Sequence, residues 1–501
     1  MNFAKIKAIL LAAGKSTRFK TRKSKMLFSI CGRPMIMYPI RTLEELGLSM
    51  TLILGHQSDQ IKALVESENV KDLSFVIQKE QLGTGHAVHC AIDSWQGFDD
   101  ILIMNGDMPL ITKELICEAL EKHEQSRAVL TFLSAMVLDP TSYGRVVELD
   151  GKFTIVEEKD CNLEQLQVNK INAGVYVINS KWLEANIEKI SKSPSGEYYL
   201  PDLIKMASEQ DAIIKEIPVP YDDVRGVNTL QELWNAEQIK RSEFIKYWMS
   251  QGVRFELAQS IHIDINVKIG AGSFIGTGVH LLGNTVIGEE CFLGAFSIVE
   301  NSKIGDETTI HSHSVIQDSV VGTSVHVGPF ARLRHNVKLG NNVEIGNFVE
   351  IKNTQIGENS KSKHLTYLGD AEIGKSVNIG AGTITCNYDG VNKFKTEIED
   401  EAFVGSNNTL IAPLNIGKGA YTAGGSTITQ DVPAGGLGIG RSRQENKLEY
   451  SQKLLGKKKS KPLVNSEIDF RENETQGDSE NKTEFNFRGA IKTNTDKQNN
   501  L

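Results

Sequence analysis

Residues 267–296 read VKIGAGSFIGTGVHLLGNTVIGEECFLGAF, and a branched apolar residue followed by glycine returns there every six residues or a multiple of six. The same spacing continues in local blocks as far as Ile379-Gly380. A six-residue period with one inward apolar side chain per repeat is typical of a parallel β-helix, whose stacked coils bury columns of Ile, Val and Leu. The period leaves the handedness open. We therefore expect a parallel β-helix in the second half of the chain.

The repeat loses its phase between Gly380 and Gly405, which are 25 residues apart. We expect the intervening segment 383–403, TITCNYDGVNKFKTEIEDEAF, to leave the solenoid as a loop. Loops that leave a rigid solenoid commonly carry function.

The first half has a different texture, in which short apolar runs alternate with helix-length segments. Apolar runs typical of buried strands begin near residue 5 and recur at 50–55, 73–78, 100–107, 129–137 and 171–178. Alternating strands and helices predict a Rossmann-like α/β domain with a mainly parallel sheet. Residues 230–251 have apolar side chains at helical spacing and no Gly or Pro, so we expect a linker helix there.

The bulk composition limits the function classes. The chain has 501 residues, a formal net charge of −8 and 40% hydrophobic residues, which fits two or three globular domains and argues against electrostatic capture of nucleic acid. Its six cysteines contain no C-x-x-C pair, so neither a zinc site nor a disulfide framework is indicated. No signal pattern opens the chain, and the longest apolar run near it, Ala8 to Ala13, is too short to span a membrane. We expect a cytoplasmic protein.

These observations predict four segments. They are an α/β domain over 1–230, a linker helix over 231–251, a β-helix over 252–456 and a polar tail over 457–501 that we expect to be disordered.

Phosphate-binding character appears after the first predicted strand. Backbone N–H groups around Gly14 can face phosphates, and Arg18 and Lys25 follow as cations. A structural turn is an equally good reading of these residues alone. Asp107 follows the strongest strand run, at the carboxyl end where α/β sheets bind ligands, and a carboxylate there suits Mg²⁺ bound to phosphates.

Asp107 alone could be a solvated turn residue, but polar and glycine groups follow several other predicted strands or turns. They are Gln78, EQLGTGHA (80–87), Tyr143-Gly144-Arg145, Glu157, Asn172 and Gly226-Val227-Asn228. Several such strand ends in one sheet predict a pocket.

The β-helix half concentrates Arg, Lys, His and Tyr in a few stretches: 328–334, 347–353, 361–374, 378–390 and 392–396. Residues one coil apart stack in a solenoid, so separated cations can meet at one anionic ligand. A single histidine such as His364 is more often a surface residue than a base, but Lys352, Tyr367 and Asn387 accompany it.

The chain resembles, at these motifs, the bacterial bifunctional UDP-N-acetylglucosamine pyrophosphorylases and glucosamine-1-phosphate N-acetyltransferases. The resemblance over about 5–230 is carried by LAAGKSTR, Lys25, QKEQLGTGHA, NGDMPL, YGR, VEEKD, INAGVYV, GEYYLPD and RGVN, and over about 252–445 by HLTYLGDAEIG and NIGAGTITCNYDG. It implies a left-handed β-helix, a homotrimer with active sites between subunits, Mg²⁺, and UTP and acetyl-CoA as co-substrates.

The resemblance also implies residue roles in the first half. UTP and the UDP-sugar would be bound by Leu11, Ala12, Ala13, Gly14, Lys25, Gln78, Gly83, Thr84, Asn105, Gly106, Asp107, Gly144, Glu157, Asn172 and Asn228. Asp107 and Asn228 would hold Mg²⁺. Arg18 would face the triphosphate and Lys25 the reacting phosphoryl groups, which makes both of them catalytic.

In the second half, the resemblance makes His364 the general base that accepts a proton from the amine of glucosamine 1-phosphate. The amino-sugar phosphate would be bound by Arg334, Lys352, Tyr367, Asn378 and Lys393, and acetyl-CoA by Ala381, Asn387, Tyr388, Ser406, Gly424 and Arg441. The product, UDP-N-acetylglucosamine, supplies cell-wall and, in Gram-negative organisms, lipopolysaccharide synthesis.

The chain departs from this family at three positions. Ser16 stands where a second glycine is usual, Ser24 where a proline precedes the lysine, and Gly424 where alanine is frequent. Two other functions keep the same architecture: a nucleotidyltransferase whose β-helix only oligomerises, and a non-catalytic regulator. The presence of Lys25, Asp107 and His364 favours the bifunctional enzyme over both.

Overall fold

The computed structural model describes residues 3–456. The chain divides into two compact units, residues 1–441 and 442–501. The described part of the second unit contains helix α8 (Tyr450–Gly456). The predicted polar tail over 457–501 lies outside the described residues.

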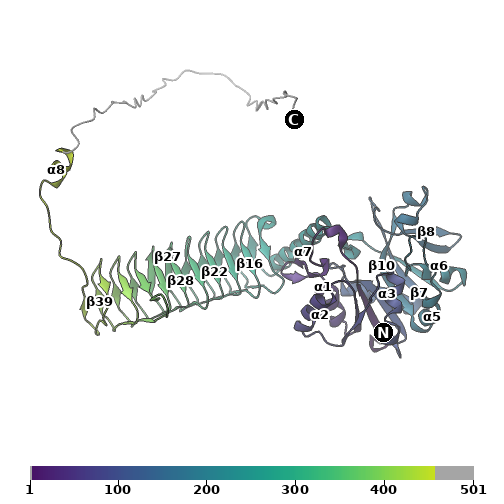
Figure 1. The fold of residues 1–501 in the computed structure, drawn as a ribbon, viewed down its shortest axis with the longest axis horizontal. Coiled ribbons are helices and arrows are strands. Elements are labelled where there is room, and N and C mark those ends of the chain that lie inside the picture. Colours follow the sequence, from purple (N-terminus) through teal and green to yellow (C-terminus); the bar gives the residue numbers. More distant parts are fainter. Residues whose placement is uncertain (1–2, 457–501) are drawn as a thin grey trace, which may run out of the picture. The chain divides into compact units, whose positions relative to one another are not determined.

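The first unit begins with an α/β domain around a nine-stranded sheet, drawn in purple to teal in Figure 1. Its main path runs in the order β11 (Ile214–Pro218), β7 (Leu130–Met136), β10 (Lys170–Asn179), β6 (Asp100–Asn105), β1 (Ile6–Ala12), β4 (Ser49–Leu54) and β5 (Leu73–Ile77). All of these strands are parallel to one another except β10, which is antiparallel to β6 and β7. A branch adds β8 (Arg145–Leu149) and β9 (Lys152–Val156).

Helices pack against this sheet and bury apolar side chains on both of its faces. They are α1 (Met37–Glu45), α2 (Ser58–Ser67), α3 (Thr84–His89), α4 (Lys113–Ser126), α5 (Ser180–Asn186) and α6 (Asp202–Glu209). A small hairpin of β2 (Ser29–Ile30) and β3 (Arg33–Pro34) precedes α1. Helix α7 (Leu230–Ser250) confirms the predicted linker helix, and a Thr229 side chain caps it by accepting a bond from the Glu232 N–H.

Three parallel sheets form the second half of the first unit, and each is named here by its first strand. The β12 sheet contains β12 (Arg254–Phe255), β15 (Phe274–Ile275), β18 (Phe292–Leu293), β21 (Thr309–Ile310), β24 (His326–Val327), β27 (Glu344–Asn347), β30 (Lys361–His364), β33 (Asn378–Ile379), β36 (Phe403–Val404), β39 (Tyr421–Thr422) and β41 (Leu437–Gly438). The β13 sheet contains β13 (His262–Ile263), β16 (His280–Leu282), β19 (Ile298–Glu300), β22 (Val315–Gln317), β25 (Arg332–Arg334), β28 (Glu350–Lys352), β31 (Tyr367–Gly369), β34 (Ile384–Cys386), β37 (Thr409–Ile411) and β40 (Thr427–Ile428). The β14 sheet contains β14 (Lys268–Ile269), β17 (Val286–Ile287), β20 (Lys303–Ile304), β23 (Val320–Val321), β26 (Lys338–Leu339), β29 (Gln355–Ile356), β32 (Ala371–Ile373), β35 (Thr396–Ile398) and β38 (Leu414–Ile416).

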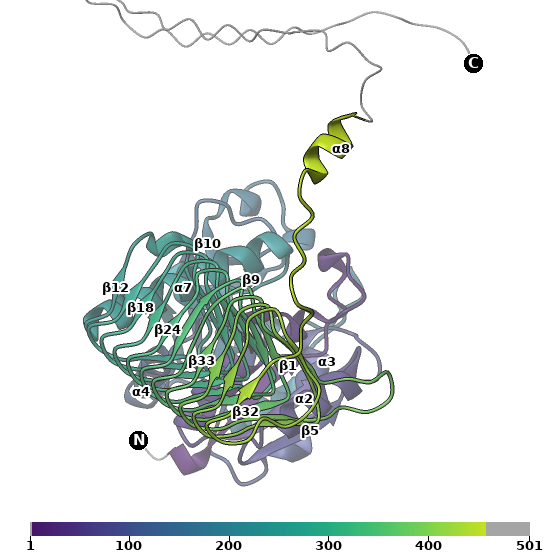
Figure 2. The same ribbon diagram turned by 90° about the vertical axis from the view of Figure 1, so that its left-hand side faces the viewer.

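Successive coils stack in register, as Figure 2 shows nearly end on. In the β13 sheet, for example, Leu281 pairs with Val299, Val299 with Ile316 and Ile316 with Leu333, and all four are buried. Burying each such side chain contributes about 1.5–3 kcal/mol. These columns are the apolar positions of the six-residue repeat. The predicted fold class is confirmed: a Rossmann-like domain with a mainly parallel sheet, followed by a left-handed parallel β-helix.

The predicted loop is present but shorter than 383–403. Strands β34 and β35 keep residues 384–386 and 396–398 in their sheets, so only 387–395 leaves the coil. A bridge between Tyr388 and Lys393 closes this loop into a small hairpin. Within residues 3–456, no helix combines the length and the apolar character needed to cross a bilayer.

Candidate active sites

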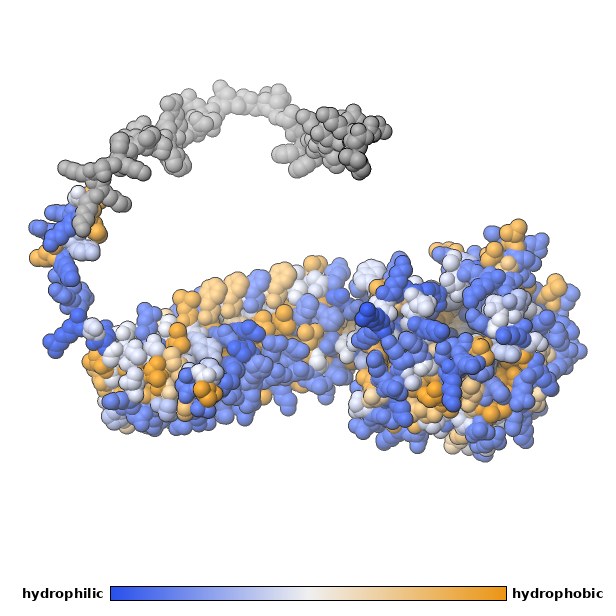
Figure 3. All heavy atoms as spheres, viewed as in Figure 1, coloured by the Kyte–Doolittle hydropathy of each residue, from blue (hydrophilic) through white to orange (hydrophobic). Residues whose placement is uncertain are grey.

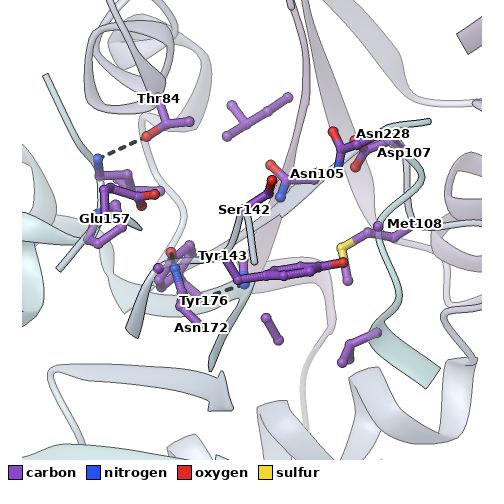
Figure 4. Close-up of a pocket in the computed structure, with 18 residues that line it drawn as sticks. Thr84, Asn105, Asp107, Met108, Ser142, Tyr143, Glu157, Asn172, Tyr176 and Asn228 are labelled. Atoms are coloured by element: carbon purple, nitrogen blue, oxygen red, sulfur yellow. Dashed lines mark hydrogen bonds between the residues drawn. The ribbon is translucent and has the colours of Figure 1, made fainter. Parts of the chain in front are cut away.

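A cavity of about 250 Å³ opens at the carboxyl ends of β1 and β6, and Figure 4 shows its lining. Eight of the predicted residues line it: Leu11, Thr84, Asn105, Asp107, Gly144, Glu157, Asn172 and Asn228. Asp107 and Asn228 lie together at one end of the view and Glu157 at the other. The sheet brings them together because the carboxyl ends of parallel strands meet at one edge.

Two cations join this cavity from the loop that follows β1. The Lys25 ammonium donates to a carboxylate oxygen of Asp107 and to Asn228 Oδ1 at 2.8 Å. The Arg18 guanidinium donates to the same Asn228 oxygen at 2.9 Å. Arg18 is exposed, whereas the Lys25 and Asp107 side chains are 10% and 11% exposed. A partly dehydrated pair of this kind interacts more strongly than a surface ion pair.

The fold holds both oxygen donors in place. The Val227 N–H donates to the Asp107 carbonyl at 3.0 Å, which ties the segment before α7 to the end of β6. The Asn228 N–H donates to the Glu232 carboxylate at 2.7 Å, which belongs to the capped first turn of α7. Asn228 is therefore positioned by a helix cap.

Asp107 also has an unused acceptor, which bears on the predicted magnesium site. Its Oδ1 atom is buried and has no hydrogen-bond partner among the described residues. An unpaired buried carboxylate oxygen is costly, so it calls for a cation or a donor from a ligand. No cluster of three or more His, Cys, Asp or Glu that could hold a metal occurs in the described part of the chain. One carboxylate and one amide oxygen fit Mg²⁺, which usually takes its other ligands from water and substrate phosphates.

The opposite end of the cavity is suited to a neutral polar ligand. The Asn172 amide donates to the Tyr176 hydroxyl at 2.6 Å, and its oxygen accepts from the Gly174 N–H at 3.1 Å. Gly174 has φ +75° and lies in a bulge of β10, where a Cβ would meet the Asn105 amide. Burial, and to a smaller extent the Glu197 carboxylate, raises the pKa of Glu157. This end therefore combines fixed amides with a carboxyl group that takes up a proton more readily than usual.

Gln78, Gly83 and Thr84 lie on one loop beside the cavity. The Gln78 amide donates to the Gly83 carbonyl at 3.1 Å and pairs with His86 Nδ1 at 3.0 Å. Gly83 has φ +106°, and a Cβ there would lie 2.4 Å from the Tyr198 carbonyl oxygen, so this close approach requires glycine. The Thr84 hydroxyl accepts from the Leu200 N–H at 3.0 Å.

The other predicted residues of the first half lie next to the lining residues in the chain. Ala12 and Ala13 are buried after Leu11, while Gly14 is exposed with open space around it. The Gly106 N–H donates to the Leu11 carbonyl at 2.9 Å, which joins the ends of β1 and β6.

Sequence analysis did not assign a role to Tyr143, although it quoted its YGR motif. The Tyr143 ring lines the cavity, and its hydroxyl pairs with the Tyr221 hydroxyl at 2.9 Å. The only signal for Tyr143 was its place beside Gly144. Tyr221 carries no such signal, because the two rings meet only in the folded chain.

The second site lies on the β-helix, where His364 ends β30. The Asn347 oxygen accepts from His364 Nδ1 at 2.9 Å, and the two residues are register partners in adjacent coils. Because the amide oxygen takes the Nδ1 proton, the exposed His364 presents an unprotonated Nε2. Asn347 had no predicted role.

Cations gather in the neighbouring β13 sheet. Arg334 and Lys352 are register partners, and Arg334 Nε donates to Glu350 at 2.7 Å. The Lys393 side chain, from the 387–395 loop, lies beside Lys352, and hydrogen bonding to it together with its positive charge lowers the pKa of Lys352. Two ammonium groups held side by side form a natural anion site.

The loop itself is anchored through Asn387. The Asn387 amide donates to Asp370, and the other Asp370 carboxylate oxygen accepts from Asn353 at 2.6 Å. Burial raises the pKa of the Tyr367 hydroxyl in this neighbourhood. Tyr388 bonds only within the loop, to the Gly390 carbonyl at 2.6 Å.

The remaining predicted residues follow along later coils. Asn378 pairs in register with Lys361 at the start of β30, one coil after it. The Ala381 carbonyl accepts from the N–H of residue 407 at 2.7 Å, and the Ser406 carbonyl from that of residue 425 at 2.8 Å. Arg441 donates to the Gly424 carbonyl at 2.9 Å. A Cβ at Gly424 would make only an ordinary contact, 3.4 Å from the Ser406 carbonyl oxygen, so alanine fits there.

Comparisons with known proteins agree with this geometry. Residues 8–145 match the model of the MobA-like NTP transferase domain, and residues 257–336 match the GMPPB C-terminal domain. A bifunctional protein GlmU from Fervidobacterium nodosum is 41% identical over 449 residues, which cover 89% of this chain and 97% of the relative. The chain belongs to the bifunctional GlmU family. Relatives of the same name from Exiguobacterium sibiricum and Clostridium botulinum are each 42% identical, over 88% of this chain and 99% and 96% of their own lengths.

Membership of the GlmU family confirms the resemblance recognised in the sequence. It also confirms the two expected activities, uridylyl transfer and glucosamine-1-phosphate acetylation, in the biosynthesis of UDP-N-acetylglucosamine. The family assignment sets aside the single-activity transferase and the non-catalytic regulator.

Proposed function

We propose that the two activities occupy the two sites described above and run in series. The β-helix segment 252–456 acetylates glucosamine 1-phosphate, and the α/β segment 1–230 then transfers UMP from UTP to the N-acetylglucosamine 1-phosphate formed. Helix α7, within the linker 231–251, lies between the two segments in the chain. The observation that carries the first assignment is the meeting of Lys25, Asp107 and Asn228 at the cavity edge.

Uridylyl transfer needs positioning and charge neutralisation, because the sugar phosphate attacks the α-phosphate of UTP in line and pyrophosphate leaves. Lys25 and Arg18 lie where they can balance the charge of the triphosphate. Asp107 and Asn228 would hold Mg²⁺, which neutralises phosphate charge when bound. The fixed amide of Asn172 and the Glu157 carboxyl group would bind the sugar at the other end of the cavity.

Acetyl transfer starts from an amine that must lose a proton to attack the thioester. The unprotonated Nε2 of His364 accepts that proton, while Asn347 holds the ring through Nδ1. The amine nitrogen bonds to the acetyl carbon, and CoA leaves as the thiolate. Arg334, Lys352 and Lys393 would hold the sugar phosphate, with Tyr367 and Asn378 beside them. Ala381, Asn387, Tyr388, Ser406, Gly424 and Arg441 would line the acetyl-CoA side.

We propose a homotrimer assembled through the β-helix. Its support is an exposed ladder of side chains at one corner of successive coils, made of Phe296, His313, Phe330, Phe348 and Leu365. Neighbouring rings in it stack with centroids 5.0–5.4 Å apart. Figure 3 shows hydrophobic side chains gathered along one edge of the β-helix.

The ladder also bears on where the second site lies in a trimer. Its last two members directly follow Asn347 and His364 in the chain, so a partner subunit on the ladder would lie against the acetyl-transfer site. We place the enzyme in the cytoplasm, where UTP and acetyl-CoA are made.

The test is a coupled assay with purified protein, glucosamine 1-phosphate, acetyl-CoA, UTP and Mg²⁺, in which free CoA thiol and pyrophosphate are followed separately. Release of both is expected. Pyrophosphate that appears only when N-acetylglucosamine 1-phosphate is supplied would show that the β-helix does not acetylate. Release of neither would overturn the proposed function.

A further inference from the structure

The loop between β1 and Lys25 is held by side chains that sequence analysis identified only as departures from the family. Ser16 lies in the left-handed region, with φ +55° and ψ +30°, where glycine is the residue without strain. Its hydroxyl accepts from the Lys25 N–H at 3.2 Å. Ser16 therefore exchanges conformational ease for a bond that closes the loop directly at the catalytic lysine.

A second bond to this loop comes from Gln57, which lies between β4 and α2. The Gln57 carboxamide oxygen accepts from the Ser24 N–H at 2.7 Å, and its nitrogen donates to the Arg22 carbonyl. One side chain thus holds the backbone on both sides of residue 23. Gln57 itself has φ +58°, so the contact is made from a strained position.

The contact between Gln57 and Ser24 depends on what stands at position 24. Ser24 is buried, with φ −58° and ψ +139°, which are backbone angles that proline adopts. A proline there would fix φ but would have no N–H to donate to Gln57. With serine, the chain gains that N–H, and the Gln57 oxygen pairs with it.

We propose that Gln57, together with Ser16, is a positioning residue for uridylyl transfer that replaces the stiffness of a proline before Lys25. The bonds from Ser16 and Gln57 hold the residues on either side of the loop turn, so that the Lys25 ammonium reaches Asp107 and Asn228. This inference rests on the role of Lys25 under the proposed function. It concerns only the first site, so acetyl transfer serves as an internal control.

The experiment is a double-mutant cycle of Gln57→Ala and Ser24→Pro in the full-length protein, with pyrophosphate release as the readout. Q57A is expected to lower kcat roughly tenfold, because two net hydrogen bonds to the loop are lost, with a much smaller change in the KM for UTP. In the S24P background, Q57A is expected to change kcat less than about twofold, because proline already fixes the loop and offers no N–H. Gln60→Ala, on the exposed first turn of α2, is the matched control.

Tryptic cleavage of the loop gives a readout that does not depend on activity. Lys20, Arg22 and Lys23 are exposed cleavage sites, and Q57A should speed their cleavage while S24P/Q57A restores protection. An unchanged kcat in Q57A, or an equal loss in both backgrounds, would overturn the inference. If Q57A also lost acetyl transfer, Gln57→Glu would replace it in the cycle, since it keeps the acceptor and loses only the donor. A wild-type protein without uridylyl transfer would instead refute the proposed function, and the cleavage pattern would still decide whether Gln57 holds the loop.

Discussion

The Asp107→Ala variant tests whether the Lys25, Asp107 and Asn228 cluster carries uridylyl transfer. Asp107 supplies the only carboxylate of the cluster, and one of its oxygens is buried without a partner among the described residues. Removing it deprives a metal ion of its charged ligand, which is worth several kcal/mol of transition-state stabilisation. A loss of about 4 kcal/mol corresponds to a roughly thousandfold fall in kcat.

The same substitution should affect stability much less. Lys25 loses its ion pair but keeps the Asn228 oxygen at 2.8 Å, and the unpaired carboxylate oxygen disappears with the side chain. We therefore expect a decrease of about 1–2 kcal/mol in the free energy of unfolding. The gap between the two numbers separates a catalytic role from a structural one.

The assay measures pyrophosphate release from UTP and N-acetylglucosamine 1-phosphate over a range of Mg²⁺ concentrations, with a thermal melt of each protein. Acetyl transfer, followed through CoA thiol, is the internal control and should be unchanged. Asp107→Asn is the matched variant, since it keeps the size and loses the charge. A variant that retains uridylyl transfer within about tenfold of wild type would refute the reasoning, because a charged metal ligand is worth more than that.

Three further predictions use other parts of the molecule. His364→Ala should lower acetyl transfer by about 10²–10⁴-fold, measured as CoA thiol release, and leave uridylyl transfer intact; loss of both would contradict independent sites. Glu157→Gln should raise the melting temperature at pH 7. Because burial raises the folded-state pKa of Glu157, the wild type loses stability as the pH rises from the unfolded-state pKa through the folded-state pKa, so the advantage of the variant should vanish in melts below about pH 4.3. An advantage that persists there would contradict the assigned cause. Phe330→Asp should place a charge in the exposed ladder and dissociate the trimer in sedimentation experiments, with acetyl transfer lost and uridylyl transfer kept; an intact trimer would exclude the ladder as the interface.

Much of the fold follows from local patterns. The six-residue repeat indicated the β-helix because each inward Ile, Val or Leu occupies an equivalent place in its coil, as in the column from Leu281 to Leu333. The 383–403 loop was predicted too long because Ile384 and Ile398 return to their sheets although the glycine spacing is lost. A register partner in the preceding coil holds each of them there, and a glycine count does not contain that partner.

The candidate residues were mostly identified from motifs, but their partners were not. Tyr221, Asn347 and Gln57 belong to no motif that sequence analysis used. Each is a polar side chain of ordinary type whose importance comes from one hydrogen bond to a distant residue. Such a bond leaves no periodic or compositional trace in the chain.

The sequence by itself determined the two architectures, the family and most residues of both sites. These depend on local order, namely which apolar residues recur and which short motifs stand at strand ends. Only the tertiary structure decided that Lys25 meets Asn228, 203 residues away, and that Asn347 stacks under His364 at a distance of 17 residues while Arg334 stacks on Lys352 at 18. The physical reason is that coil length varies with each turn and that strand ends far apart in the chain converge only when the sheet has formed. The chemistry of both sites depends on those meetings.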